Sequence, residues 1–276
     1  MYFSIRSLRG IKVVNLRKLA PYILTKAMKF MCPECGRRDE IIGDAGPRCT
    51  RCGAPMLAAT ESYKGLLINP KFVIERMTRL VQTYGLREVE ASGRFKQERE
   101  AWTSAVWALG LSEMNPKDYW VEVVTDEQTP DTRVHYLDQS TGDNHVMTCN
   151  VEVVDWETHV HDPMQLIGAK CAKAYPDYFF LVLLARSGKV VYPQMIANDV
   201  RGIAVPFAEI WMLGRASDSD TLVHMARLHP LPVVNVDFDL REALNKTRSD
   251  PMFLQRQTRG RGTEFTSLGP IYLPIP

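Results

Sequence analysis

Long hydrophobic runs are absent from this sequence. Its apolar stretches, such as Leu181 to Ala185, are short and broken by charged residues, whereas a helix that crosses a bilayer needs about 20 apolar residues. A membrane protein is therefore not expected. The sequence also has no glycine-rich phosphate-binding loop and no serine nucleophile elbow, which argues against the enzyme classes built on those motifs.

Histidine is sparse and shows little metal-ligand spacing. The segment from Thr158 to Asp162 reads Thr-His-Val-His-Asp and partly resembles the His-x-His-x-Asp-His motif of metallo-β-lactamase-like hydrolases. Pro163 and Met164 then break the motif, so we interpret the segment as a polar loop between a strand and a helix. The other four histidines have no such spacing: His135, His145, His224 and His229.

Acidic residues are nearly missing from the first 38 positions, where Glu34 is the single acid. The basic residues of this stretch are Arg6, Arg9, Lys12, Arg17, Lys18, Lys26, Lys29, Arg37 and Arg38. The formal net charge of +2 therefore conceals a positive field at one end of the chain, suited to phosphate or another anionic surface. We expect residues 1–30 to form a basic arm. Organelle targeting is the alternative for this segment.

Four of the six cysteines form two tight pairs, Cys32-Pro-Glu-Cys35 and Cys49-Thr-Arg-Cys52, each followed by glycine. Two intervening residues let a turn aim both thiolates at one ion, and four thiolates suit tetrahedral zinc. The spacing predicts a structural zinc ribbon over residues 31–60, with rubredoxin-like iron as the alternative. Metal-binding thiolates indicate a reducing, cytoplasmic compartment. Cys149 and Cys171 are interpreted as small apolar residues of a strand and a helix.

A zinc site filled by four protein ligands is structural, so its function depends on what surrounds it. Arginines cluster around the two cysteine pairs, and we expect them to contact the nucleic-acid backbone: Arg37, Arg38, Arg48 and Arg51. The alternative is that these arginines only solvate a small surface.

The pattern of apolar residues predicts an α/β core over residues 70–215. Helices are expected at residues 70–84, at 94–109 with Gly110 as the stop, and after Pro163. Strands are expected at residues 119–125, 133–138, 146–156, 178–185 and 208–213. This order predicts a mixed sheet flanked by helices. Residues 216–276 are expected to form a C-terminal extension with a helix at 240–246, capped by Asp239, and an extended tail available to other protein subunits.

Pro130 and Asp131 precede the second of these expected strands, and acidic residues lie along the third. Together with the order helix, three strands, helix, strand, this resembles the PD-(D/E)xK nuclease superfamily over about residues 94–213. The resemblance implies a restriction-endonuclease-like fold, with metal-binding acids at the start of the second strand and along the third. The acids that it singles out are Glu98 on the first helix, Asp131, Glu152, Asp155 and Glu157.

The segment Val153 to Thr158 also looks like the RecB-type branch of that superfamily, which would make Asp155 a ligand supported by Gln165. Alternate residues of a strand point the same way, so Asp155 and Glu157 share a face while Glu152 faces oppositely. Only one of these two sets can form the site.

The lysine that the superfamily places two residues after the third-strand acid is missing. Val154 occupies this position in the Glu152 register, and Glu157 in the Asp155 register. Some members of the superfamily use a glutamate at this position, or take the lysine from the following helix, where Lys170 and Lys173 are available. An inactivated nuclease core is the alternative.

The resemblance implies Mg²⁺ or Mn²⁺, because phosphodiester hydrolysis uses a hard dication that polarises the phosphoryl oxygen and activates water. The sequence thus predicts a metal-dependent DNA endonuclease in which an N-terminal zinc ribbon docks the nucleic acid. The alternative is a non-catalytic scaffold subunit of a nucleoprotein assembly, built on a degenerate nuclease core.

Overall fold

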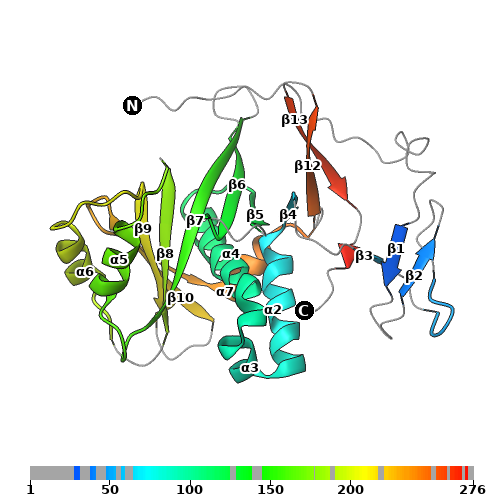
Figure 1. Cartoon of the computed structure of the whole chain (residues 1–276), viewed down its shortest axis with the longest axis horizontal. Coiled ribbons are helices and arrows are strands. Elements are labelled where there is room, and N and C mark those ends of the chain that lie inside the picture. Colours follow the sequence, from blue (N-terminus) through cyan, green and yellow to red (C-terminus); the bar gives the residue numbers. More distant parts are fainter. Residues whose placement is uncertain are drawn as a thin grey trace.

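The computed structural model describes residues 28–31, 38–41, 48–53, 57–59, 65–124, 129–138, 145–176, 178–186, 190–216, 221–249, 253–259, 262–268 and 271–272. The described strands form a ten-stranded sheet and a separate four-stranded sheet (Figure 1). Helices flank the large sheet, which contains both parallel and antiparallel pairs. The expected α/β class with a mixed sheet is therefore confirmed.

Apart from α6, the elements at the centre of the large sheet follow the order that the sequence predicted. Its elements are α4 (Lys96–Met114), β5 (Tyr119–Val123), β6 (Thr132–Asp138), β7 (His145–Glu157), α5 (Pro163–Cys171), β8 (Phe179–Arg186), α6 (Pro193–Val200) and β9 (Glu209–Arg215). Strands β5, β6 and β7 form an antiparallel meander. Strands β7, β8 and β9 are parallel neighbours, with α5 and α6 as the crossover helices.

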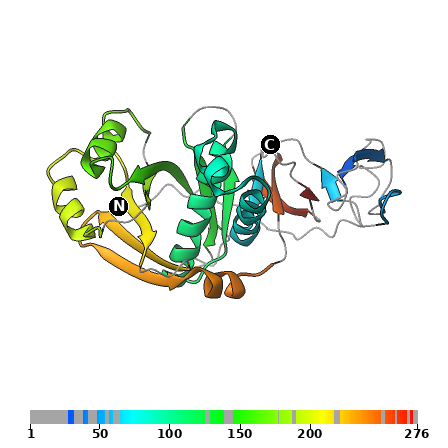
Figure 2. The same cartoon turned by 90° about the horizontal axis from the view of Figure 1, so that it is seen from below.

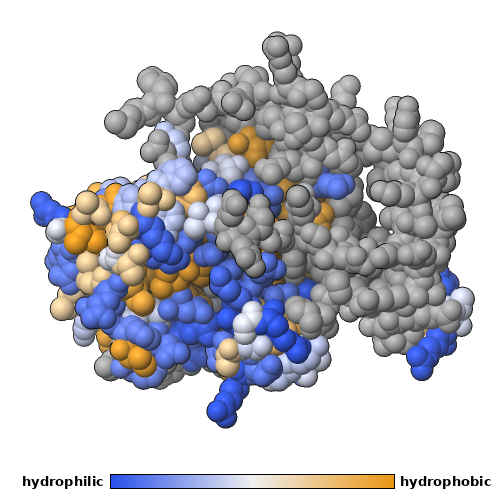
Figure 3. Space-filling view, in the orientation of Figure 1, coloured by the Kyte–Doolittle hydropathy of each residue, from blue (hydrophilic) through white to orange (hydrophobic). Residues whose placement is uncertain are grey.

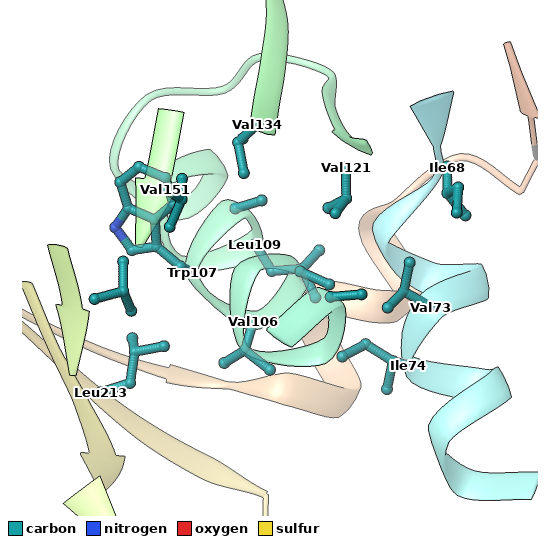
Figure 4. Packing of buried hydrophobic residues seen from close by; sticks show 14 of the residues in the cluster. Ile68, Val73, Ile74, Val106, Trp107, Leu109, Val121, Val134, Val151 and Leu213 are labelled. Atoms are coloured by element: carbon teal, nitrogen blue, oxygen red, sulfur yellow. The ribbon is translucent and has the colours of Figure 1, made fainter. Parts of the chain in front are cut away.

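Two apolar layers cover the large sheet. On one face, α4 packs with α2 (Pro70–Tyr84) and α7 (Leu240–Lys246). Trp107 is fully buried in this layer, in ring contact with Phe180 and Trp211, and Val151 lies beside it (Figure 4). On the other face, α5 and α6 pack through Ile167 and Ile196. The short helix α3 (Leu86–Ala91) and the 3₁₀ turn η2 (Gly93–Phe95) connect α2 to α4.

Gly110 does not end α4, contrary to expectation; the helix runs on to Met114. A β-carbon at Gly110 would lie 2.8 Å from the Met225 sulfur and 2.9 Å from a Phe238 ring carbon. This glycine therefore serves the close approach of α4 to the sheet, a packing role that helical periodicity does not reveal.

The segment after residue 216 contributes strands as well as the expected helix. Strands β10 (Leu222–His229) and β11 (Val234–Asp239) extend one side of the large sheet. The predicted helix at 240–246 is confirmed, and the Asp239 side chain caps it by accepting the backbone N–H groups of Arg241 and Glu242. Strands β12 (Phe253–Arg259) and β13 (Gly262–Leu268) then form a hairpin on the other side.

Strand β4 (Leu66–Ile68) joins the β12–β13 hairpin to the meander. It pairs with β5 on one side and with residues 253–255 of β12 on the other. Residues 256–259 pair with β13 beyond the end of β4, so this part of the hairpin extends past β4 (Figure 1). The sequence predicted only an extended tail here.

The four-stranded sheet consists of β1 (Met28–Met31), β2 (Arg38–Ile41), β3 (Leu57–Ala59) and β14 (Ile271–Tyr272). It lies at one end of the elongated molecule, and α5 and α6 lie at the other (Figures 1 and 2). Strand β14 pairs in parallel with β3, so the end of the chain is joined to this sheet.

The face seen in Figure 3 is largely hydrophilic where it is described, with small, separate apolar areas. Exposed apolar side chains of the described residues include Val190, Tyr192 and Met195 next to and within α6. Scattered apolar residues of this kind are common on soluble proteins. None of the described helices combines the length and the apolar character that crossing a bilayer requires.

Candidate active site

Asp131 lies at the point where β6 and β7 separate. The two strands pair from Asp138 opposite His145 to Thr132 opposite Val151, and β7 then continues to Glu157 beside β8 alone. The Asp131 carboxylate, immediately before β6, accepts the backbone N–H of Val153 at 2.9 Å. One acid is thereby held against the edge of β7 that has lost its strand partner.

Glu152 lies on β7 beside this point and is only 1% exposed. Its Oε2 atom is 2.5 Å from the ammonium group of Lys170 on α5 and accepts the Tyr175 hydroxyl at 3.3 Å. Its Oε1 atom is buried and has no hydrogen-bond partner within the described part of the chain. The parallel crossover from β7 through α5 to β8 brings these groups together.

Glu100 of α4 is a third acid near Asp131 and Glu152. We call these three residues the acidic group. The Glu100 carboxylate lies 3.4 Å from the ammonium of Lys96, one helical turn earlier. Burial, and then the charge of Asp131, raise the pKa of Glu100 to about 7, although Lys96 and Lys170 oppose this. The charge of Glu100 is also the main cause of a raised pKa for Lys96, to which Asp131 and Glu152 contribute.

Three carboxylates and two ammonium groups therefore share one region, supplied by α4, the start of β6, β7 and α5. Each of these groups influences the ionisation of another. A cavity of about 200 Å³ is lined by Lys96, Arg99, Glu100, Val153 and Asp155. Lys96 and Glu100 belong to both sets, whereas Asp131, Glu152 and Lys170 are not among the lining residues of the cavity. Acidic and basic side chains in one cleft are suited to binding a cation together with an anionic group.

The structure corrects the expectation for Glu98. This residue is buried, as its apolar surroundings in the sequence indicated, but its carboxylate pairs with Arg76 of α2 at 3.2 Å. Two residues along a helix turn the side chain by about 200°, so Glu98 faces α2 while Glu100 faces the acidic group. Sequence reasoning missed Glu100; the Lys96 to Glu100 spacing of one turn was the signal available.

Asp155 differs from its expected role as a Mg²⁺ ligand. Its carboxylate contacts the guanidinium of Arg186 at 3.3 Å and that of Arg99 at 3.9 Å. Arg186 also bonds Glu90 at 3.0 Å, and Arg99 donates to the carbonyls of residues 89 and 92 at 2.8 Å each. Asp155 lines the cleft, but its charge is balanced by arginines that hold α3 against the sheet.

Glu157 and Gln165 are both exposed. On α5, Gln165 and Lys170 are five residues apart, which turns their side chains by about 140° from one another. Of the predicted catalytic residues, the structure thus brings Asp131, Glu152 and Lys170 together, and it leaves Glu98, Glu157 and Gln165 outside this group.

The polar loop predicted at Thr158 to Asp162 joins β7 to α5. His159 and His161 are exposed there. The Asp162 side chain caps α5 by accepting the Met164 N–H at 3.0 Å, and the carbonyl of His161 accepts the Trp156 indole N–H at 2.8 Å. These are loop and capping contacts, as expected.

A dication such as Mg²⁺ needs hard oxygen ligands, which the carboxylates of the acidic group supply. Within the described residues, no three His, Cys, Asp or Glu side chains converge as a metal-binding group. Mg²⁺ commonly takes only one or two carboxylates and keeps several waters. The buried Oε1 of Glu152 and the mutual repulsion of Glu100 and Asp131 fit a cation at this position.

The second cysteine pair forms a tight turn. Gly53 adopts φ = +74°, a left-handed conformation that glycine accepts, and its N–H donates to the Cys49 carbonyl at 2.8 Å. Cys49 is 3% exposed and Cys52 is exposed. The Arg48 guanidinium bonds the Gly53 carbonyl at 3.1 Å.

Some residues of the predicted ribbon lie outside the described residues: Cys32, Cys35, Arg37 and the side chain of Arg38. The backbone beside them is described. Met31 pairs with both Arg38 and Leu57, so these three residues form one row at one end of the small sheet. The first cysteine pair lies in sequence between Met31 and Arg38, and the second shortly precedes Leu57.

Comparison of this chain with known protein families, curated proteins and solved structures finds no match.

Proposed function

We propose that this protein is a metal-dependent nuclease of the PD-(D/E)xK type that hydrolyses phosphodiester bonds in nucleic acid, with DNA as the expected substrate. The observation that carries the proposal is the contact between Lys170 and Glu152, beside Asp131 and Glu100. The sequence has no lysine in the usual place on the strand, and α5 supplies one to the same carboxylate. An acid pair with an adjacent lysine is the arrangement that the resemblance to the PD-(D/E)xK superfamily implies.

The order of elements supports a restriction-endonuclease-like core. Helix α4, the meander β5–β7, helix α5 and strand β8 follow in the order that the resemblance implies. The separation of β6 from β7 leaves Asp131 and Glu152 at a rim of the sheet. Asp131 is half-buried there and Glu152 is buried.

Each side chain of the group would have a distinct task. Asp131 and Glu152 would hold the dication, with Glu100 as a third acid close by. Mg²⁺, when bound, would polarise the phosphoryl oxygen and lower the pKa of a bound water. Lys170 would orient the attacking water or bind the phosphate, and Lys96 and Arg99 of the cleft would neutralise the backbone charge.

We also propose a zinc ribbon at residues 31–60 that binds the nucleic-acid backbone through Arg37, Arg38, Arg48 and Arg51. The tight turn at Cys49 to Gly53 supports it. The pairing of Met31 with Arg38 and with Leu57 supports it too, because Met31 and Arg38 flank the first cysteine pair in the sequence and Leu57 follows the second. The sheet lies away from α5 along the molecule (Figure 2). This separation suits a substrate long enough to contact both.

A non-catalytic scaffold is the second candidate. Two observations favour it: no three potential ligands converge among the described residues, and the charge of Asp155 is balanced by arginines. A scaffold needs the fold and the ribbon but no cation at Glu152. Cation-dependent cleavage therefore separates the two candidates.

The test is an incubation of the purified full chain with plasmid DNA, single-stranded DNA and RNA, in Mg²⁺, in Mn²⁺ and in chelator. We expect cleavage that requires the cation and falls at least about 100-fold in Asp131→Asn and Glu152→Gln. Glu157→Gln is the matched control, because Glu157 lies on the same strand but is exposed, and its activity should equal that of wild type. Cleavage that survives in Asp131→Asn, or that persists in chelator, would overturn the proposal.

A further inference from the structure

Tyr175 contacts the candidate site from outside the expected set of residues. It follows α5 in the segment that leads to β8. Its hydroxyl donates to Oε2 of Glu152 at 3.3 Å. Lys170 contacts the same oxygen at 2.5 Å. Two donors from the α5 crossover thus converge on one atom of one carboxylate.

The tyrosine ring is fixed by its neighbours. Its centroid lies 5.2 Å from that of Phe179 and 4.8 Å from that of Phe207, both in tilted contact. Phe179 and Phe207 are each 3% exposed. Packing against Phe179 and Phe207 fixes the position of the Tyr175 ring. This position places the Tyr175 hydroxyl within hydrogen-bonding distance of Glu152. A phenylalanine would keep both ring contacts and lose only the hydroxyl.

The two carboxylate oxygens of Glu152 differ in their hydrogen-bond partners. Oε2 receives both donors, and the buried Oε1 receives none from the described residues. A buried carboxylate oxygen without a partner is costly, so its persistence calls for a ligand that completes it. A dication is such a ligand, because it prefers oxygen and compensates the negative charge.

We propose that Tyr175 is a positioning residue of the nuclease site: with Lys170 it holds Oε2 of Glu152, so that Oε1 is kept for the divalent cation. This inference rests on the proposed function, because it assigns the ligand atom of the same site. A tyrosine hydroxyl carries its proton at neutral pH and can donate it to a carboxylate oxygen.

Partners behind the first ligands orient metal-binding side chains, and their loss typically weakens metal binding or activity by about 10- to 100-fold. Tyr175→Phe should therefore weaken Mn²⁺ binding by about 10-fold in the full-length protein without nucleic acid, measured by electron paramagnetic resonance. The matched control is Tyr192→Phe, the same chemical change at a side chain 63% exposed beside α6. It should bind Mn²⁺ as wild type does.

A second readout separates positioning from a general loss of stability. The Tyr175→Phe variant should melt in chelator as wild type does, because its ring contacts are kept, and should gain less thermal stability from Mn²⁺. If it melts earlier, Mn²⁺ titration below its melting temperature still measures the affinity of the folded protein. Cleavage should recover towards the wild-type rate as Mn²⁺ is raised to saturation.

Two results would overturn the inference in different ways. Wild-type Mn²⁺ affinity in Tyr175→Phe, with binding lost in Glu152→Gln, would remove the role of Tyr175 and leave the proposed nuclease site standing. Wild-type affinity in Glu152→Gln would remove the cation from Glu152, and with it both the inference and this part of the proposed function.

Discussion

Lys170 on α5 lies 2.5 Å from the carboxylate of Glu152 on β7, although eighteen residues separate them in the chain. The crossover from β7 to the parallel strand β8 creates this contact. Glu152 and Val154 lie on the same face of β7, because alternate residues of a strand point the same way. Lys170 of α5 therefore approaches Glu152 from the face of the strand that carries Val154.

A lysine at position 154 of β7 should be able to replace Lys170 of α5. Lys170→Met should lower cleavage at least about 100-fold, because the ammonium beside Glu152 is lost. Val154→Lys in that background would return an ammonium to the same face of β7 and should recover part of the activity. Initial rates of plasmid nicking measure both effects. A Lys170→Met protein that cuts at the wild-type rate would show that the contact is structural only.

The ion pair of Lys170 and Glu152 should also contribute to stability. Breaking a buried pair from one side leaves a buried charge and costs about 3–5 kcal/mol. The Lys170 side chain is 21% exposed, so we expect a smaller loss of about 2 kcal/mol for Lys170→Met. Urea denaturation measures it. Adding Glu152→Gln to Lys170→Met should restore part of the free energy of unfolding, and a purely additive double mutant would contradict the pairing.

Glu100 should make stability depend on pH. Its folded pKa is raised to about 7 from 4.5, so between these values the folded state keeps a proton that the unfolded chain releases. The contribution is therefore fully present below about pH 4.5 and is lost as pH rises through about 7. Glu100→Gln removes this dependence, so in chelator it should stabilise the protein more at pH 8 than at pH 5. The urea denaturation midpoints of wild type and Glu100→Gln at the two pH values measure this difference. Equal effects of the substitution at both pH values would contradict a raised pKa of Glu100.

Asp155 should prove structural. Asp155→Asn weakens the contacts to Arg99 and Arg186 that hold α3, and the side chain is 41% exposed, so the loss of stability should be about 0.5–1 kcal/mol. Its Mn²⁺ affinity should match that of wild type. A tenfold or larger loss of affinity would restore Asp155 as a ligand, as the sequence suggested.

Much of the core could be predicted from sequence because its periodicities are strong. The apolar runs of residues 119–125 and 178–185 predicted the strands β5 and β8, and the helical repeat of residues 94–109 predicted α4. Strand β4 was missed because three residues carry no periodic signal. The β12–β13 hairpin was missed because its polar sequence resembles a tail, while backbone pairing with β4 organises it.

The candidate site was predictable only in part. Asp131 and Glu152 follow from their strand positions, but Glu98 and Glu100 are two residues apart on one helix, and the sequence does not say which face meets α2. Tyr175 carries no motif; its contact depends on how Phe179 and Phe207 pack around its ring.

The zinc ribbon has its own test. Cys49→Ser should reduce zinc content, which we expect at about one ion per wild-type chain, and should destabilise the small sheet. Cys171→Ser is the matched control, because Cys171 lies on α5 outside both pairs. Elemental analysis of the purified proteins measures the zinc. Equal zinc in wild type and Cys49→Ser would rule out the four-thiolate site.

Anomalous diffraction from crystals soaked in Mn²⁺ would show whether Asp131 and Glu152 share one dication. We expect an anomalous peak at coordination distance from the Asp131 carboxylate and from Oε1 of Glu152, with Oε2 still bound by Lys170 and Tyr175, if the two acids hold one cation. Crystals saturated with Mn²⁺ that show no peak at these two carboxylates, or a peak only elsewhere, would contradict a shared dication.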